Sequence, residues 1–221
     1  MSSGYFAIFR QTPKFFPFHY SSFSQQIKKG LTLCQPPFYL VPANIFPLIS
    51  TKSLFLFVFL IFSGWIHKTK GKIRAWGVSN FDLEDMKELL GKSNGKNCQV
   101  NQVLFHLGSR GIEYALKPWQ DKHTIPTMAY CPLAQAGTLQ RNLLSHVEIN
   151  AIADELQCTA HQVLLLFVLA QPNMIAIPKA GQIQHIKDNI ACLSMNLTKD
   201  QLARLNKAFP PPTSRVHLDI V

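Results

Sequence analysis

Two polar side chains that could position a ligand follow an apolar run in the sequence GKIRAWGVSNF, residues 71–81. Ser79 carries a hydroxyl group and Asn80 an amide, and both groups donate and accept hydrogen bonds. The run before them predicts a buried β-strand, so they would lie at its carboxyl end, where parallel α/β proteins bind their ligands. A structural role is the alternative, because Ser79 and Asn80 could simply cap the next helix.

Polar residues also stand at or just beyond the ends of three further predicted strands. They are Asn101 with Gln102, Tyr130 with Cys131, and Lys179. The strands are expected at residues 73–78, 99–105, 126–130 and 174–178, each short and apolar, as strands buried on both faces are. Longer amphipathic stretches separate them, which is typical of βα units. In a parallel α/β barrel these polar residues would share one rim.

The helices between the strands have clear start signals. Capping boxes are predicted at Ser145 with Glu148, Thr159 with Gln162, and Thr198 with Gln201. Asp82 is expected to cap a further helix that ends near Gly91. Residues 161–170, HQVLLLFVLA, are apolar nearly all round, which favours a helix in the core over a strand or a membrane span.

Four segments in a fixed order carry a resemblance to a known family. They are GKIRAWGVSNF, VNQVLFHLGSRGIEY, MAYCPLAQAG and IPKAGQIQHIKDN. They resemble the carboxyl-terminal half of the aldo-keto reductase family, especially bacterial members described as methylglyoxal reductases. The resemblance covers residues 71–221. It implies an α/β fold that is a partial TIM (β/α)8 barrel, made of the four carboxyl-terminal βα units.

The resemblance also implies a cofactor, NADP(H), bound across the carboxyl-terminal rim. Ser79, Asn80 and Gln102 match the side chains that hydrogen-bond the nicotinamide carboxamide in the family. Tyr130 matches the aromatic ring that stacks on the nicotinamide, although it could instead belong to the core. A planar, dipolar amide needs paired donors and acceptors to fix which ring face meets the substrate.

Four residues near the end of the chain match the positions that hold the adenosine half of the cofactor. Lys179 resembles the lysine that meets the phosphates, and Asn189 an asparagine that contacts adenine. Asp188 stands where Glu or Gln is usual. His185 stands where many members carry an Arg that pairs with the 2′-phosphate, so this sequence predicts a less secure preference for NADP over NAD.

The family's catalytic tetrad of Asp, Tyr, Lys and His lies before the point where the resemblance begins. Residues 1–70 contain no Asp at all, and they lack the periodicity of βα units. We therefore predict no catalytic residue in this chain. The expected function is that of a truncated NADP(H)-dependent aldo-keto reductase that keeps the cofactor-binding half, binds the cofactor weakly or not at all, and is inactive alone. A small carbonyl substrate is expected only if the barrel is completed.

The first third of the chain differs in composition from the rest. The chain has a net charge of +10, and residues 1–81 contain nine basic residues and no acidic one. Twelve of the sixteen Phe precede Ile66. We predict two parts: an irregular, Phe-rich basic segment at 1–70 and the half-barrel at 71–221. The first segment could be disordered or come from a shifted reading frame, and it offers no strands of the right order. The apolar run at 54–66 would span about 20 Å as a helix, short of a hydrocarbon core of about 30 Å.

The sequence leaves two other classes of function open. The predicted location is cytoplasmic, with membrane association through residues 54–66 as the alternative. A non-catalytic fragment that docks on a reductase partner also stays open. Five widely spaced cysteines without a Cys-x-x-Cys pair, and eight histidines without ligand spacing, predict no metal site. No nucleic-acid motif is present, so no nucleic-acid partner is expected.

Overall fold

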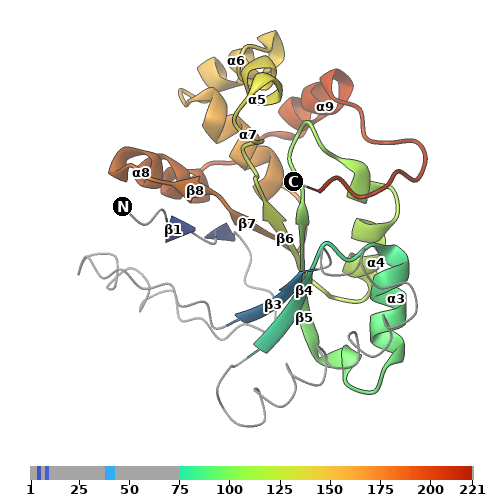
Figure 1. Cartoon of the computed structure of the whole chain (residues 1–221). Helices are drawn as coiled ribbons and strands as arrows, with labels where there is room; N and C mark the ends of the chain where they lie inside the picture. Colours follow the sequence, from blue (N-terminus) through green and yellow to red (C-terminus); the bar gives the residue numbers. More distant parts are fainter. Residues whose placement is uncertain (1–3, 6–7, 10–37, 43–74, 221) are drawn as a thin grey trace.

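Four parallel strands, side by side in chain order, form the centre of a six-stranded sheet (Figure 1). They are β4 (Ala75–Ser79), β5 (Cys98–Leu104), β6 (Thr127–Tyr130) and β7 (Met174–Ile177). The structure is a computed structural model, and it describes residues 4–5, 8–9, 38–42 and 75–220. The four strands fall where the sequence predicts them, with ends shifted by one or two residues, and the parallel α/β fold class is confirmed.

Short strands from the first third of the chain complete the described sheets. β3 (Phe38–Pro42) pairs parallel with β4, and β2 (Ile8–Phe9) pairs antiparallel with β7. β1 (Gly4–Tyr5) pairs antiparallel with β8 (Lys179–Ala180). The sequence predicts no strand of the right order here, and β3 differs from that expectation. Proline is tolerated at the end of an edge strand, which suits the segment FYLVP.

Helices and short 3-10 turns connect the strands. The helices are α3 (Leu83–Gly91), α4 (Leu116–Lys122), α5 (Thr138–Leu144), α6 (Val147–Glu155), α7 (Ala160–Leu169), α8 (Ile183–Ala191) and α9 (Lys199–Ala208). The 3-10 turns are η2 (Gly95–Asn97), η3 (Gly111–Glu113) and η4 (Cys192–Ser194). Figure 1 shows α3 and α4 to the right of the sheet and α5, α6 and α9 above it. α8 lies to the left, beside β8.

Three of the four predicted helix caps are present. Thr159 and Thr198 each accept a hydrogen bond in a capping box, with Gln162 and Gln201 bonding back to the cap. Asp82 caps α3, which ends at Gly91. The predicted capping box at Ser145 is wrong, because Ser145 is the C-cap of α5 and the next residue, His146, is the N-cap of α6. There the Nδ1 atom of His146 accepts the backbone N–H of Glu148 at 3.2 Å, so an imidazole takes the role predicted for a hydroxyl.

The two faces of the sheet bury different apolar clusters. The larger cluster lies between the sheet and the helices. It includes Trp76, Val78 and every residue from Val163 to Leu169. The smaller cluster, on the opposite face, consists of Val100, Met128 and Ile175. Since strand side chains alternate between faces, Ser79 shares the face of the smaller cluster, because Val78 points to the helices.

Gly77 allows β4 and β5 to approach each other on this second face. A Cβ atom at residue 77 would collide with the Cγ1 atom of Val100 and lie 2.5 Å from the Val100 backbone oxygen. The contact is too close for any side chain. Gly77 is therefore needed for the spacing that places Ser79 beside β5.

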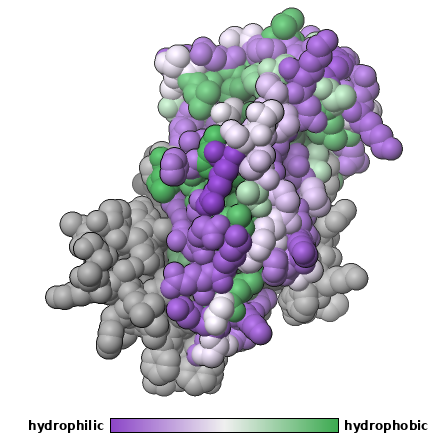
Figure 2. Space-filling model, turned by 90° about the vertical axis from the view of Figure 1, so that its right-hand side faces the viewer, coloured by the Kyte–Doolittle hydropathy of each residue, from purple (hydrophilic) through white to green (hydrophobic). Residues whose placement is uncertain are grey.

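The outer surface over α3 and α4 is mostly hydrophilic (Figure 2). On α3, Lys87 and Lys92 form exposed ion pairs with Glu84 and Glu88. Among the described residues no single helix is long and apolar enough to cross a membrane; α6 and α7 meet those criteria only as a pair bent by 88°. The apolar run at 54–66 lies outside the described residues.

The carboxyl-terminal segment after α9 is held at two points. Ser109 Oγ, in the loop after β5, donates to a carboxylate oxygen of Asp219 at 2.5 Å. Arg215 forms ion pairs with Asp82 at 2.8 Å and Glu84 at 3.4 Å, at the start of α3. The end of the chain thus lies over the loops that follow β4 and β5.

His106 is buried beneath this segment, with 1% of its surface exposed. Its Nδ1 atom accepts the backbone N–H of Gly108 at 3.1 Å, and its Nε2 atom has no hydrogen-bond partner among the described residues. Burial lowers the pKa of His106 from 6.5 to about 4, and the charge of Asp219 opposes this shift more weakly. The folded protein therefore holds a neutral imidazole here.

We expect Gly77→Ala to lower the free energy of unfolding by about 1–3 kcal/mol, the usual cost of overpacking. Gly91→Ala is the matched control, because a Cβ atom there meets nothing within 4 Å and Ala favours the last turn of a helix. Urea denaturation of the purified chain measures both. Equal stabilities for the two variants would contradict the close approach of β4 and β5.

The buried imidazole also predicts a loss of stability in acid. Because the pKa of His106 is about 4 in the folded chain and about 6.5 when unfolded, the unfolded state binds the extra proton between these pH values. Stability should fall with falling pH across this window, by up to about 1.4 kcal/mol per pH unit, and level off below it. His106→Gln should remove this component, as measured by urea unfolding at pH 7 and pH 5. A difference between the two proteins that does not change with pH would refute it.

Candidate cofactor site at the strand ends

Ser79 and Gln102 meet at the carboxyl ends of β4 and β5. They are directly opposite each other in the parallel pairing, and Ser79 Oγ donates to Gln102 Oε1 at 3.4 Å. Gln102 Nε2 lies 3.6 Å from the sulfur of Met128, its neighbour on β6. A thioether is a weak acceptor, so the amide N–H groups of Gln102 keep donor capacity toward this face. The structure thus brings two of the predicted residues into contact.

Asn80 follows in the left-handed region of backbone space, with a φ angle of 57°. Asparagine adopts this conformation more readily than most residues. Its backbone N–H donates to the backbone oxygen of Gln102 at 2.8 Å, which ties the turn to β5. The Oδ1 atom of Asn80 is buried and has no hydrogen-bond partner among the described residues. A buried acceptor without a donor is costly, and it points to a ligand N–H group.

Tyr130 ends β6 on the same face of the sheet. It pairs with Leu104 on β5 and Ile177 on β7, two residues beyond the row that contains Gln102 and Met128. The ring is half-buried, neither fully in the core nor fully exposed. The next residue, Cys131, has a pKa raised by burial, so its thiol stays protonated. Tyr130 can thus supply a ring surface above the row of polar groups.

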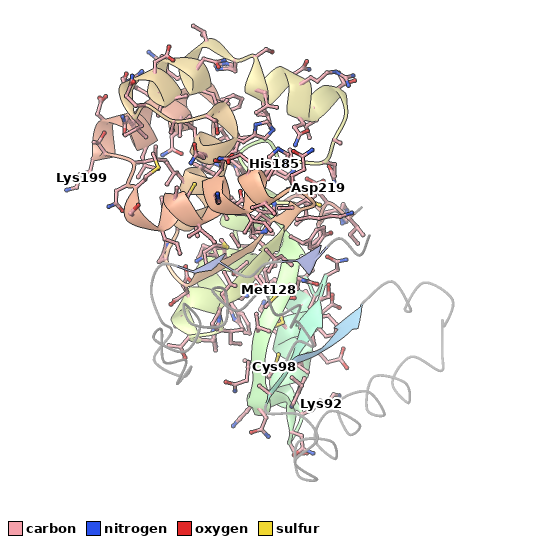
Figure 3. All side chains as sticks on the ribbon, turned by 90° about the vertical axis from the view of Figure 1, so that its left-hand side faces the viewer. Lys92, Cys98, Met128, His185, Lys199 and Asp219 are labelled. Carbon is pink, nitrogen blue, oxygen red and sulfur yellow. The ribbon has the colours of Figure 1, made fainter. Side chains whose placement is uncertain are left out.

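The second group of predicted residues lies on β8 and α8. Lys179 is exposed on β8, and His185 is exposed on the first turns of α8. Asp188 Oδ1 accepts from Gln184 Nε2 at 2.8 Å, and Asn189 is buried, with 8% of its surface exposed. Figure 3 shows His185 at the opposite end of the sheet from Cys98, which begins β5. Both groups of predicted residues therefore belong to the carboxyl-end side of the strands.

Two residues on α7 that sequence reasoning missed interact with α8. Gln162, on α7, donates from Nε2 to the backbone oxygen of Asp188 at 3.0 Å, which joins the two helices. His161 has a pKa below its usual value, first because of burial and second because of the nearby His185. The sequence signalled Gln162 only as a helix cap, and nothing in it paired the two histidines.

Asn101 also belongs to this region, but on the other face of the sheet. Its buried side chain brackets the backbone of Phe81: Nδ2 donates to the Phe81 oxygen at 2.8 Å, and Oδ1 accepts the Phe81 N–H at 3.4 Å. The sequence marked Asn101 as a polar landmark without separating its role from that of Gln102. Strand alternation is the signal that could have separated them.

A hollow of about 650 Å³ lies far from these residues. Its lining comes from Lys87, Leu90, Lys96, Cys98, Gln99, Trp119, His123, Thr124, Ile125 and Pro126, at the amino ends of β5 and β6. Burial raises the pKa of Cys98 to about 12, so its thiol is inert. None of the predicted cofactor residues lines this hollow, so it is separate from the candidate site.

The candidate site can hold and orient a polar ligand. Ser79, Asn80 and Gln102 offer donors and acceptors but no group that readily gives up a proton. Within residues 75–220 and the short described strands, no cluster of His, Cys, Asp or Glu could bind a metal ion. The chemistry that these residues support is binding and orientation.

Comparison with known proteins matches this arrangement. The Aldo/keto reductase family profile matches residues 66–209. Methylglyoxal reductase YeaE of Escherichia coli is 49% identical over 152 residues, which is 69% of this chain and 54% of that protein. An aldo-keto reductase of Mycolicibacterium vanbaalenii is 33% identical over 139 residues, 63% of this chain and 47% of that protein. The chain spans about half the length of these curated relatives.

Solved structures show the same likeness. An aldo-keto reductase from Klebsiella pneumoniae in complex with NADPH is 46% identical, with a TM-score of 0.71 over 73% of this chain and 57% of that one. A second from the same organism, in complex with NADP and acetate, is 42% identical, with a TM-score of 0.75 over 84% and 62%. The family profile covers more than half of the chain, and the fold and the order of the polar strand ends agree with it, so this chain belongs to the aldo/keto reductase family.

Proposed function

We propose that this chain is the cofactor-binding half of an NADP(H)-dependent aldo-keto reductase and that alone it binds the cofactor without reducing a carbonyl. The observation that carries the proposal is the row formed by Ser79 and Gln102 beside the unpartnered Oδ1 atom of Asn80. Relatives of similar sequence are described in complex with NADPH and NADP, which supports the same cofactor here.

The three polar side chains match the groups of a nicotinamide carboxamide. The carboxamide NH₂ needs acceptors, and Asn80 Oδ1 is a buried acceptor awaiting a donor. The carboxamide oxygen needs a donor, which the Ser79 hydroxyl or the Gln102 amide can supply. Tyr130, further along the same face, offers a surface for the ring. When bound, NADPH would supply a hydride; these residues would fix which face of its ring is presented.

The adenosine half would extend toward α8. Lys179 is an exposed ammonium group just before this nine-residue helix, and the amino end of a helix favours phosphate. Asn189 and Asp188 would contact adenine. His185 would stand at the 2′-phosphate in place of the usual arginine, without the bidentate fork that an arginine supplies. Preference for NADP over NAD would accordingly be modest.

The missing chemistry is an acid for the carbonyl oxygen. Residues 1–70 contain no Asp and match no part of the family profile before residue 66. In this proposal the chain divides at about residue 70, between the Phe-rich segment and the half-barrel. A small carbonyl compound such as methylglyoxal would be a substrate only for a completed barrel, in a cytoplasmic protein.

We expect the purified chain to bind NADP⁺ weakly and to show no oxidation of NADPH with methylglyoxal or aromatic aldehydes. Without a general acid the reaction loses about 10²–10⁴-fold, and an incomplete barrel must order its rim on binding. Calorimetry measures the binding, and the absorbance of NADPH measures turnover. Asn80→Ala should weaken binding, whereas Lys96→Ala, in the distant hollow, should not.

Two results would refute this. Carbonyl-dependent turnover that is lost in Tyr130→Ala would show that a working acid lies in the first 70 residues. If the unaltered chain and Asn80→Ala bound NADP⁺ equally well, the carboxamide would not lie in the proposed site.

We also expect limited proteolysis to remove most of residues 1–68 before it cuts residues 75–220. The capped helices and buried strands of the latter part resist local opening. Mass spectrometry of the fragments over time gives the order of cleavage. Early cuts within 75–220, with the first third intact, would contradict the division.

A further inference from the structure

The two hydrogen bonds between the Asn101 side chain and the Phe81 backbone, called the bracket below, belong to a buried polar network that reaches the turn after β4. Asn101, Gln120 and Thr127 are each 0% exposed. Asn101 Nδ2 donates to Gln120 Oε1 at 3.2 Å, and Gln120 Nε2 donates to Thr127 Oγ1 at 3.2 Å. Asn101 thus has partners on α4 and in the turn after β4, and Gln120 has partners on β5 and β6. These hydrogen bonds hold Asn101 in one orientation.

The bracket binds the backbone of Phe81, two residues beyond the end of β4. The Asn101 side chain replaces the backbone of a neighbouring strand for Phe81, because it both donates to the Phe81 oxygen and accepts the Phe81 N–H. On the other side of the turn, the backbone of Gln102 accepts the N–H of Asn80 at 2.8 Å. Asn80 is thus fixed through its own N–H and through the residue that follows it.

We propose that Asn101 is a positioning residue for nicotinamide binding: it acts from the helix-facing side of the sheet to hold Asn80 in its left-handed conformation and its Oδ1 atom toward the cofactor. This inference rests on the proposed function and adds a residue to it. Asn101 does not touch the cofactor, because strand alternation points it away from the face that carries Gln102.

Positive φ angles carry an energetic cost, and they persist where surrounding contacts enforce them. Without the bracket, the turn gains other conformations, and ligand binding must reorder it. The affinity for the nicotinamide half should therefore fall, whereas the adenosine half, held at α8, should be unaffected. A purely structural role would lower stability and leave both affinities of the folded protein unchanged.

The test compares two ligands on the full chain, NADP⁺ and adenosine 2′,5′-bisphosphate, which lacks the nicotinamide half. Asn101→Leu should weaken NADP⁺ binding by about tenfold or more and leave bisphosphate binding unchanged. Gln120→Leu, which keeps the bracket but removes its support, should weaken NADP⁺ binding less. Gln201→Leu is the matched control: it removes a buried amide, 5% exposed, from a capping box on α9, and should lower stability without changing either affinity.

Hydrogen exchange gives a second readout if Asn101→Leu folds poorly. In Gln120→Leu the amides of Asn80 and Phe81 should exchange faster, with the amides of α7 and α9 unchanged. Unchanged NADP⁺ affinity in Asn101→Leu, or unchanged exchange at Asn80 in Gln120→Leu, would overturn the positioning role. If the unaltered chain bound NADP⁺ no more tightly than the bisphosphate, the proposed nicotinamide site would itself be wrong, and the positioning role with it.

Discussion

The alternation of side chains along β5 is the constraint on which the candidate site depends. Asn101 and Gln102 are neighbours in sequence, and the strand turns one toward the helices and the other toward the opposite face. One amide thereby holds the backbone of the loop after β4, and the other joins Ser79 in the polar row. A shift of one residue in the pairing of β4 with β5 would exchange the two roles and bury Gln102 among apolar helices.

The polar row sits above an apolar base, and the two are built by the same strands. Val100, Met128 and Ile175 fill the face below Gln102. Apolar contacts exclude water, so hydrogen bonds made by the row are stronger than they would be on an open surface. The proposed binding of a carboxamide by three uncharged side chains relies on this exclusion of water. In this proposal no charged group is needed at the nicotinamide end, whereas the ammonium group of Lys179 is proposed to meet the phosphates.

The strands and most helix caps could be predicted from sequence because they follow from local rules. Thr159 and Thr198 each place a hydroxyl three residues before a glutamine, and that spacing alone defines a capping box. His146 could not be predicted, because imidazole is an unusual cap and Ser145 offered a more familiar one. β3 was missed because its pairing with β4 joins segments far apart in the chain. The family motifs indicated Ser79, Gln102 and Tyr130, but the role of Asn101 depends on Gln120 and Thr127, which no local pattern connects.

The contact at Gly77 limits how this part of the sheet can change during evolution. Of the two atoms that a Cβ at residue 77 would strike, one belongs to the side chain of Val100 and the other to its backbone. A smaller residue at position 100 would relieve the first conflict but not the second, since every amino acid carries the same backbone oxygen. No single compensating substitution at position 100 can therefore restore a variant at Gly77. A chain with a side chain at this position would have to separate β4 from β5, and the hydroxyl of residue 79 would move away from Gln102.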